Sequence, residues 1–287
     1  MSATNSNIEQ SKAQQDEAKE FKGPNEEGKK TALILIADGS EEIETVVPFD
    51  VLIRAGFQVI TVGVGLDMVF NAPAASATLS RGLRIIPDHT FLDLPSSITP
   101  DVLVLPGGKK GAETFFEQET VQNLIRTTFK SNVESELKKV EKEGQEDKKP
   151  EDREKKEIKV QKGIGKKHYI AAICAATKAV VRAIEEAPED DKKAWGLDEK
   201  KPTVTSHPSV EKEVKGDEDG FLYYGKDKEE GKGKKYKGWN YSKDRVVVDR
   251  QFITSRGPGT AMEWALKIAE VVGGVEAREK AQEGMML

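Results

Sequence analysis

The sequence has few of the residues that usually identify a metal site or a disulfide framework. It holds one cysteine and three histidines in 287 residues, and only 6% of it is aromatic. A single cysteine cannot form an intrachain disulfide, which indicates a reducing compartment, so we expect the cytoplasm, with the nucleus as a second location. Neither the histidines nor the cysteine show the spacing of metal ligands, and we expect no bound metal.

Long apolar runs and a basic net charge are absent as well. No run approaches the roughly 18 apolar residues that a membrane-spanning helix needs. The first 30 residues lack the apolar segment of a secretory signal. The chain has 50 acidic residues against 45 lysines and arginines, a formal net charge of −5. We therefore expect no membrane partner and no nucleic-acid partner, and a small molecule or a protein instead.

Composition divides the chain into one domain and three polar segments. Residues 1–29 have too little apolar surface to fold, so we predict a disordered polar tail followed by one domain over 30–280. A charged insertion is predicted over 131–165, because 20 of the 29 residues from Glu134 to Lys162 are charged, ten of each sign. A second insertion, over 211–243, mixes Lys and Gly with aromatic residues. These aromatics are predicted to pack on the domain, and stacking on single-stranded bases is the alternative.

Apolar strands alternate with helical patterns through the domain. A βαβ unit is predicted from a strand at 31–37, a helix over 43–56 and a strand over 57–64. Further strands are predicted at 83–86, 101–105, 169–174, 202–206 and 246–255, and further helices at 117–130, 175–186 and 260–272. Apolar strands that alternate with helices are typical of a mostly parallel sheet covered on both faces. The predicted fold class is therefore α/β.

Three of these strands end in segments suited to bind a ligand. In an open parallel sheet, ligands bind beyond the carboxyl ends of the strands. The segments are IADGSEEIET (36–45), VLPGGKKGAE (104–113) and AAICAAT (171–177). The paired glycines of the second segment let backbone N–H groups approach a ligand closely. We predict the functional site at this edge of the sheet.

The only cysteine, Cys174, stands where a predicted strand turns into a helix. Such a turn exposes a nucleophile in hydrolase-type elbows. The positive end of the following helix is expected to lower the pKa of the thiol and favour the thiolate. The alternative is structural, because a free cysteine is usually a small buried hydrophobic residue.

Three acids, Glu41, Glu42 and Glu44, follow the first strand. The structural interpretation is that acids in the first turn of a helix are stabilised by its dipole, with Ser40 as the cap. The functional interpretation requires one acid to turn inward, where burial raises its pKa and lets it donate a hydrogen bond to a thiolate or move a proton. Helical phase favours Glu44 for this position.

A histidine also follows a strand, in TVTSHPS. This residue, His207, is a candidate base for the cysteine, provided that folding brings the two together. His89 and His168 are interpreted as surface or structural residues. At a further strand end, in ITSRGPGTAMEWAL, Ser255 and Arg256 are candidates for holding an anion, although Arg256 is equally suited to a structural salt bridge.

Five segments in this order resemble the DJ-1/PfpI superfamily, and within it the DJ-1-like and glyoxalase III (D-lactate dehydratase) branch. They are DGSEEIETVVPFDVLIRAGFQV, DVLVLPGGKKGAE, AAICAAT, TVTSHP and ITSRGPGTAMEWAL. The resemblance covers residues 30–280 without the two insertions. It implies a flavodoxin-like three-layer α/β sandwich with a mostly parallel sheet, and a homodimer. One departure is that Ala176 and Thr177 stand where many relatives have Gly-Pro.

The resemblance also implies roles for particular residues. The catalytic set that it implies is Cys174 as nucleophile, Glu44 as its carboxyl partner, His207 as the histidine, and the backbone N–H groups of Gly108 and Ala175 as an oxyanion hole. The substrate-binding residues that it implies are Gly107, Arg54, Arg81 and Ser255, around an anion pocket that a second subunit completes.

The function that the resemblance implies is a glutathione-independent glyoxalase, which converts methylglyoxal to lactate through a cysteine hemithioacetal. Written as a hydro-lyase, the activity is that of a D-lactate dehydratase. It needs no cofactor and serves methylglyoxal detoxification in a stress response, with early protein glycation adducts as a related substrate. The alternative is a redox-sensing, chaperone-like protein whose Cys174 is oxidised to sulfinic acid. Glutamine amidotransferase and peptidase functions are disfavoured because no acid follows His207 to orient it.

Overall fold

The computed structural model describes residues 28–66, 75–95, 98–130, 167–197, 200–216, 218, 220–224 and 234–287. The predicted insertion at 131–165 lies outside the described residues, and so does the predicted tail apart from residues 28 and 29. Both therefore stay predictions.

The domain is built on a seven-stranded sheet with the strand order β12-β13-β7-β6-β1-β2-β5. Its strands are β1 (Thr31–Ile36), β2 (Gln58–Gly63), β5 (His89–Thr90), β6 (Val102–Leu105), β7 (Tyr169–Ile173), β12 (Val246–Asp249) and β13 (Phe252–Ser255). Neighbouring strands are parallel except β12 and β13, which pair antiparallel. β1 and β6 lie in the middle of the sheet and are buried along their whole length. This burial is typical of parallel strands that are covered on both faces and read as nearly continuous apolar runs. The predicted α/β class is confirmed.

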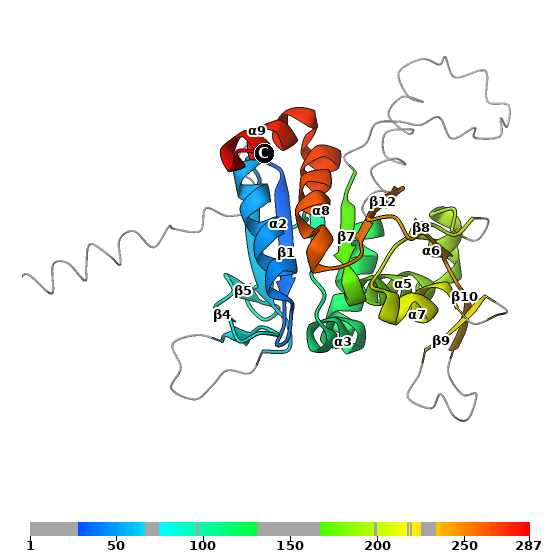
Figure 1. The fold of residues 1–287 in the computed structure, drawn as a ribbon. Helices are drawn as coiled ribbons and strands as arrows, with labels where there is room; N and C mark the ends of the chain where they lie inside the picture. The colour runs from blue at the N-terminus through cyan, green and yellow to red at the C-terminus, as the bar shows by residue number, and fades with distance from the viewer. Residues whose placement is uncertain are drawn as a thin grey trace, which may run out of the picture.

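Two groups of helices cover the sheet and complete the flavodoxin-like sandwich. The first group is α2 (Glu42–Arg54), α8 (Ala261–Ile268) and α9 (Val275–Met285), which contact one another; a π-helical turn over Ala269–Gly273 joins α8 to α9. The second group is α3 (Lys109–Glu117), the helical residues 119–130 and α5 (Thr177–Glu185). Figure 1 shows the two groups on either side of the strands, with α2 and α8 side by side.

Short elements lie outside the main sheet. Three two-stranded sheets pair β3 (Ala77–Thr78) with β4 (Arg84–Ile85), β8 (Thr203–Val204) with β11 (Asn240–Tyr241), and β9 (Phe221–Tyr224) with β10 (Lys234–Lys237). The remaining helices are α6 (Glu189–Ala194) and α7 (Glu211–Lys215). The predicted strands at 83–86 and 202–206 therefore exist but belong to these small sheets, which corrects the expectation that they join the parallel one.

The second insertion, where it is described, is attached to the domain. The antiparallel pair of β9 and β10 forms its strands, and Trp239, which follows them, is only 3% exposed. The Trp239 indole N–H donates to the carboxylate of the buried Glu185 at 2.6 Å. Tyr236 and Tyr241 are partly buried against the core. This packing agrees with the predicted attachment of the aromatic residues to the domain.

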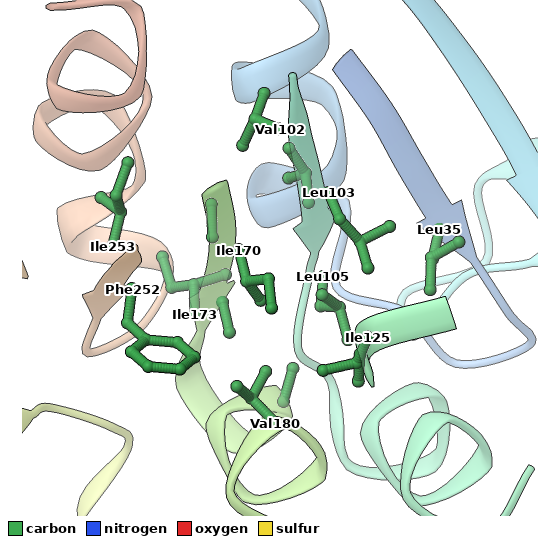
Figure 2. Packing of buried hydrophobic residues seen from close by; sticks show 14 of the residues in the cluster. Leu35, Val102, Leu103, Leu105, Ile125, Ile170, Ile173, Val180, Phe252 and Ile253 are labelled. Atoms are coloured by element: carbon green, nitrogen blue, oxygen red, sulfur yellow. The ribbon is translucent and has the colours of Figure 1, made fainter. Parts of the chain in front are cut away.

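One apolar core fills the space between the sheet and its helices. Figure 2 shows Ile170 of β7, Leu105 of β6 and Val180 of α5 close to one another, with Phe252 of β13 beside them. Burying a side chain of this size contributes about 1.5–3 kcal/mol. The core therefore fixes β6, β7 and α5, which carry two of the three predicted site segments.

Neither a membrane span nor a metal site is found in the described ranges. No helix there is long and apolar enough to cross a bilayer. No group of three or more His, Cys, Asp or Glu side chains there is arranged to hold a metal ion.

Candidate active site

Three neighbouring strands, β7, β6 and β1, bring the predicted segments to one edge of the sheet. The strands are parallel, so their carboxyl ends coincide. The segment after β1 leads to Glu44, the segment after β6 contains Gly107 and Gly108, and Cys174 follows β7 directly. The arrangement places a thiol, a carboxyl group and backbone amides around one point.

Cys174 begins a tight turn between β7 and α5, in which a 3₁₀ turn over Cys174–Ala176 precedes the helix. Its φ of 62° lies in the left-handed region. This conformation costs an L-amino acid about 1–2 kcal/mol, so the packed strand and helix on either side must hold it. The turn has the form of the strand-to-helix elbow predicted from the sequence.

Gly107 lets the thiol and the carboxyl group come together. A Cβ at this position would lie 2.6 Å from Cys174 Cβ and 2.6 Å from Glu44 Oε2, which is closer than packed atoms allow. The N–H of Gly107 donates to Glu44 Oε2 at 2.7 Å. Gly107 thus acts through its backbone, and any side chain here would separate the two groups.

Glu44 points inward from the first turn of α2 and is fully buried, as its helical phase predicts. Its Oε2 accepts the Gly107 N–H and lies on the same side of Gly107 as the Cys174 Cβ. Its Oε1 is buried and has no hydrogen-bond partner in the described part of the chain. Burial, the largest cause, and the charge of Glu41 raise the pKa of Glu44 from 4.5 to about 7.

Cys174 is buried, with an exposed fraction of 9%. The pKa of its thiol differs from the lowered value that we expected from the sequence. Burial, followed by the charge of Glu44, raises the pKa of Cys174 from 9.0 to about 12. Hydrogen bonds from the backbone N–H groups of Ala175 and Gly108 oppose this rise but are outweighed. The expectation that the helix start lowers the thiol pKa is therefore wrong, chiefly because the thiol is buried.

The thiol and the carboxyl group titrate as a coupled pair, which carries one negative charge between about pH 7 and about pH 12. The charge lies on Glu44 when the thiol keeps its proton, and on the sulfur when Glu44 holds the proton. Two backbone N–H groups, those of Gly108 and Ala175, act on the sulfur, whereas one, that of Gly107, acts on the carboxylate. The thiolate beside a neutral carboxyl group is the reactive form of the pair; the two N–H groups on the sulfur favour it, and burial of the sulfur disfavours it.

His207 is attached to the elbow through its backbone. Its N–H donates to the Cys174 carbonyl oxygen at 3.1 Å, and its side chain is exposed. Its Nδ1 accepts the Ser209 N–H at 3.1 Å and lies 2.8 Å from Ser209 Oγ. In the neutral ring the proton is therefore on Nε2. Among the described contacts, the ring makes no hydrogen bond with Cys174 or Glu44.

Arg54, one of the predicted substrate-binding residues, lies away from the other site residues. It stands ten positions after Glu44 on α2, which corresponds to about 15 Å along a helix. Its Nε donates to Asp50 Oδ2 at 2.7 Å and its Nη1 to the Gly284 carbonyl oxygen at 2.7 Å. Within this chain the structure does not bring Arg54 to the thiol.

The hydroxyl group of Ser255, another predicted substrate-binding residue, makes hydrogen bonds within the protein. Ser255 is fully buried, its Oγ donates to the Arg245 carbonyl oxygen at 2.7 Å, and the same atom lies 2.7 Å from Thr260 Oγ1. Arg256 donates to the Lys243 carbonyl oxygen at 2.7 Å. These contacts hold the start of α8 on the end of β13.

Arg81 lies near the start of α2 with an exposed side chain. Its backbone N–H donates to the Glu42 carboxylate, and its Nη1 donates to Ser80 Oγ at 3.1 Å. Of the predicted substrate-binding side chains, Arg81 is the one that the structure leaves exposed near the site segments.

The cap of α2 differs from the prediction. Glu41, and not Ser40, is the N-cap residue: its Oε2 accepts the Glu44 N–H at 2.9 Å. Ser40 Oγ instead accepts the Ala37 N–H at 3.0 Å. Glu41 therefore holds the backbone of Glu44 and places a negative charge beside it. An acid three positions before Glu44 was the sequence signal for this cap.

Replacing Glu41 with glutamine is expected to lower the pKa of Glu44 while keeping the helix cap. The glutamine carbonyl oxygen can still accept the Glu44 N–H, but the charge that contributes to the raised pKa is removed. The acidic limb of kcat/KM against pH should move to lower pH. An unchanged limb in Glu41→Gln would show that Glu41 does not influence the titration of the pair.

Thr177, one of the two departures from the family pattern, ties the elbow to the segment that carries His207. Its Oγ1 donates to the Thr205 carbonyl oxygen at 3.1 Å. Both residues are buried. A proline at position 177 has no hydroxyl group and could not make this contact. The departure thus adds a hydrogen bond between α5 and the chain leading to His207.

Replacing Thr177 with valine is expected to cost about 1 kcal/mol in the free energy of unfolding, because the buried Thr205 carbonyl oxygen loses a donor. Thr177→Ser keeps the hydroxyl group and is the matched control. Urea unfolding measures the cost, and turnover shows whether the position of His207 matters. Equal stability and turnover in both variants would mean that this hydrogen bond contributes neither to the fold nor to the site.

The fold and this site define a class: α/β proteins with a cysteine on a strand-to-helix elbow beside a buried glutamate. The chain belongs to the DJ-1/PfpI family, whose model matches residues 30–134 and 144–271.

Similar proteins support this assignment over most of the chain. The Parkinson disease protein 7 homolog of Danio rerio is 31% identical over 260 residues, which cover 90% of this chain and 97% of that protein. The glutathione-independent glyoxalase DJR-1.2 of Caenorhabditis elegans is 30% identical over 248 residues, 86% of this chain and 91% of that protein. The crystal structure of Drosophila melanogaster DJ-1beta superposes with a TM-score of 0.58 at 27% identity, covering 90% of this chain and 98% of that one.

Proposed function

We propose that this chain is a glutathione-independent glyoxalase that converts methylglyoxal to lactate through a hemithioacetal on Cys174. The observation that carries the proposal is the close approach of Cys174, on its left-handed elbow, to the buried carboxyl group of Glu44: a Cβ on Gly107 would lie 2.6 Å from both Cys174 Cβ and Glu44 Oε2. The name of the Caenorhabditis elegans relative, glutathione-independent glyoxalase, supports the same activity here.

In the first half of the proposed reaction, the Cys174 thiolate adds to the aldehyde carbon C1 of methylglyoxal and forms a C–S bond. The backbone N–H groups of Gly108 and Ala175, which act on the sulfur, stabilise the oxyanion that develops on C1. The oxyanion takes the proton held by Glu44 and becomes the hydroxyl group of the hemithioacetal. Glu44 is then ionised.

In the second half, the ionised Glu44 removes the proton from C1 to give an enediol and delivers it to C2. The Nε2–H of His207 exchanges protons with the two oxygens. The product is a lactoyl thioester in which C1 is oxidised and C2 is reduced, so no external oxidant or cofactor is needed. Water hydrolyses the thioester, which releases lactate and restores the thiol. Written as a hydro-lyase, this activity is that of a D-lactate dehydratase.

A homodimer is part of the proposal. The outer face of α2 exposes four apolar side chains, Ile43, Val46, Phe49 and Ile53, each between 38% and 48% exposed. These positions follow a helical period and form one stripe. A contiguous apolar stripe of this kind is typical of a protein interface. A second copy of the chain is the proposed partner on this face.

A redox-sensing role is the second candidate, and the same pair of groups favours it. A protonated Glu44 beside the sulfur can donate a hydrogen bond to a sulfinate, and the chain has no second cysteine that could form an intrachain disulfide. Mass spectrometry after mild peroxide treatment tests this role. Sulfinic acid on Cys174 without glyoxalase turnover would favour sensing over catalysis.

The test of the proposed glyoxalase is an assay of purified protein with methylglyoxal and no glutathione. Lactate should form. In D₂O the product should retain part of its hydrogen at C2, because Glu44 carries the proton from C1 to C2 inside a buried site. The Cys174→Ala variant is the control. No lactate from the wild-type chain, or equal lactate from both proteins, would overturn the proposal.

A further inference from the structure

The turn between β13 and α8 contains a glycine whose backbone does not require glycine. Gly257 is buried, and its φ of 166° with ψ of −170° is extended backbone that any residue can adopt. A Cβ at Gly257 would meet only two atoms within 4 Å: Glu44 Oε1 and His207 Cδ2, each at 3.8 Å. Neither contact is a clash. The space beside this glycine is therefore bounded by two residues of the candidate active site.

Glu44 Oε1 is the polar atom that bounds this space. It is buried in a fully buried side chain and has no hydrogen-bond partner among the described residues, whereas Oε2 is held by the Gly107 N–H. A buried polar atom without a partner costs about 1–3 kcal/mol. A ligand that places a donor next to Gly257 would remove this cost. The two oxygens of Glu44 therefore differ: Oε2 is held by the protein, and Oε1 is available to a ligand.

We propose that the space beside Gly257 is the subsite for the acyl part of the 2-oxoaldehyde substrate, and that the missing side chain at Gly257 leaves room for the substituent on C2. This inference rests on the proposed function and names its substrate class. C2 of the hemithioacetal is bonded to C1, which the sulfur holds. The enediol hydroxyl on C2 then donates to Glu44 Oε1, and the C2 substituent lies against the Gly257 Cα.

In this arrangement, only one oxygen of Glu44 is free to move the proton between C1 and C2. Oε2 stays bonded to the Gly107 N–H and fixes the carboxyl group, so Oε1 is the atom that takes the proton from C1 and returns it to C2. A methyl group on residue 257 would enter the same space as the C2 substituent. The effect should grow with the size of that substituent, since a pocket discriminates by about 10- to 200-fold for each methylene.

The test compares Gly257→Ala and Gly257→Val with the wild-type chain on glyoxal, methylglyoxal and phenylglyoxal. The matched control is Gly259→Ala in the same turn, because a Cβ there meets nothing within 4 Å. Relative to glyoxal, kcat/KM for phenylglyoxal should fall by about 10-fold or more in Gly257→Ala, and further in Gly257→Val. Gly259→Ala should match the wild type. An equal fall for all three substrates would overturn the inference.

A second measurement does not depend on turnover. The alkylation rates of Cys174 by iodoacetamide and by the bulkier N-phenylmaleimide are compared in the same full-length proteins, whose melting temperatures show that they are folded. The ratio of the N-phenylmaleimide rate to the iodoacetamide rate should fall several-fold in Gly257→Ala. An unchanged ratio would overturn the subsite. If the wild-type chain consumes no 2-oxoaldehyde, the proposed function fails, and the alkylation ratio still decides the inference.

Discussion

Replacing Cys174 with alanine is expected to abolish lactate formation from methylglyoxal without unfolding the chain. The proposed reaction forms a C–S bond at this atom, and the chain has no second cysteine to replace it. Removing a nucleophile that works as a unit with its neighbours lowers turnover by about 10⁴-fold or more. The measurement is lactate produced by the purified variant from methylglyoxal without glutathione.

The matched control is Cys174→Gly, which also lacks the sulfur but adopts a φ of 62° without strain. The left-handed conformation destabilises alanine by about 1–2 kcal/mol. Glycine adopts it without strain but loses more conformational entropy on folding, which is a smaller effect. The glycine variant is therefore expected to be at least as stable as the alanine variant in urea. Wild-type turnover in either variant would contradict the mechanism. A clearly more stable alanine variant would contradict the strained elbow.

The main sheet could be predicted from sequence because its central strands are continuous apolar runs. Such runs, as in β1, β6 and β7, have few alternatives to a buried position between helices. The short elements could not be placed in this way. β5 is two polar residues long, and it joins the sheet only by pairing with β2. The segments at 83–86 and 202–206 resemble sheet strands, but tertiary contacts decide their partners.

The helix α3 illustrates a further limit of sequence reasoning. Its sequence, KKGAETFFE, contains a glycine and begins after two others, so its intrinsic helix propensity is low. Its stability comes from tertiary packing, because Ala112 and Phe115 are fully buried. That packing is not visible in the sequence, so α3 was not predicted, and the helix predicted at 117–130 corresponds to the helical residues 119–130.

The geometry of the site was more predictable than its electrostatics. Helical phase predicted an inward Glu44, and the resemblance to the DJ-1/PfpI superfamily implied that it would meet Cys174. The helix start was expected to dominate the thiol pKa, yet a helix dipole contributes only about 0.3–1 kcal/mol. The rise of the Cys174 pKa from 9.0 to about 12 corresponds to about 4 kcal/mol. Burial and the charge of Glu44 together outweigh the helix dipole, and both effects depend on the folded chain.

Replacing Glu44 with glutamine is expected to lower lactate formation by about 10²- to 10⁴-fold, because an amide cannot take the proton from C1. Glutamine keeps the shape of the side chain, and its carbonyl oxygen can still accept the Gly107 N–H. The nucleophile remains in place. Since the charge that raises the pKa of Cys174 is removed, iodoacetamide should alkylate the thiol faster than in the wild type at neutral pH. Slower alkylation would contradict this and would show that the carboxyl group of Glu44 favours the thiolate more than its charge disfavours it.

The same Glu44→Gln variant also tests how burial affects stability. The pKa of Glu44 is raised from 4.5 to about 7, so the folded chain binds this proton more tightly than the unfolded chain. The stabilisation is complete below the unfolded pKa of 4.5 and is lost as the pH rises through about 7. Glutamine does not titrate, so the variant should gain about 2–3 kcal/mol in unfolding free energy relative to the wild type between pH 5 and pH 8. Urea unfolding of both proteins at the two pH values measures this gain. If the difference in unfolding free energy between the two proteins does not change with pH, water reaches the Glu44 carboxylate in the folded chain. A hydrated carboxylate could not keep the proton that the proposed reaction transfers.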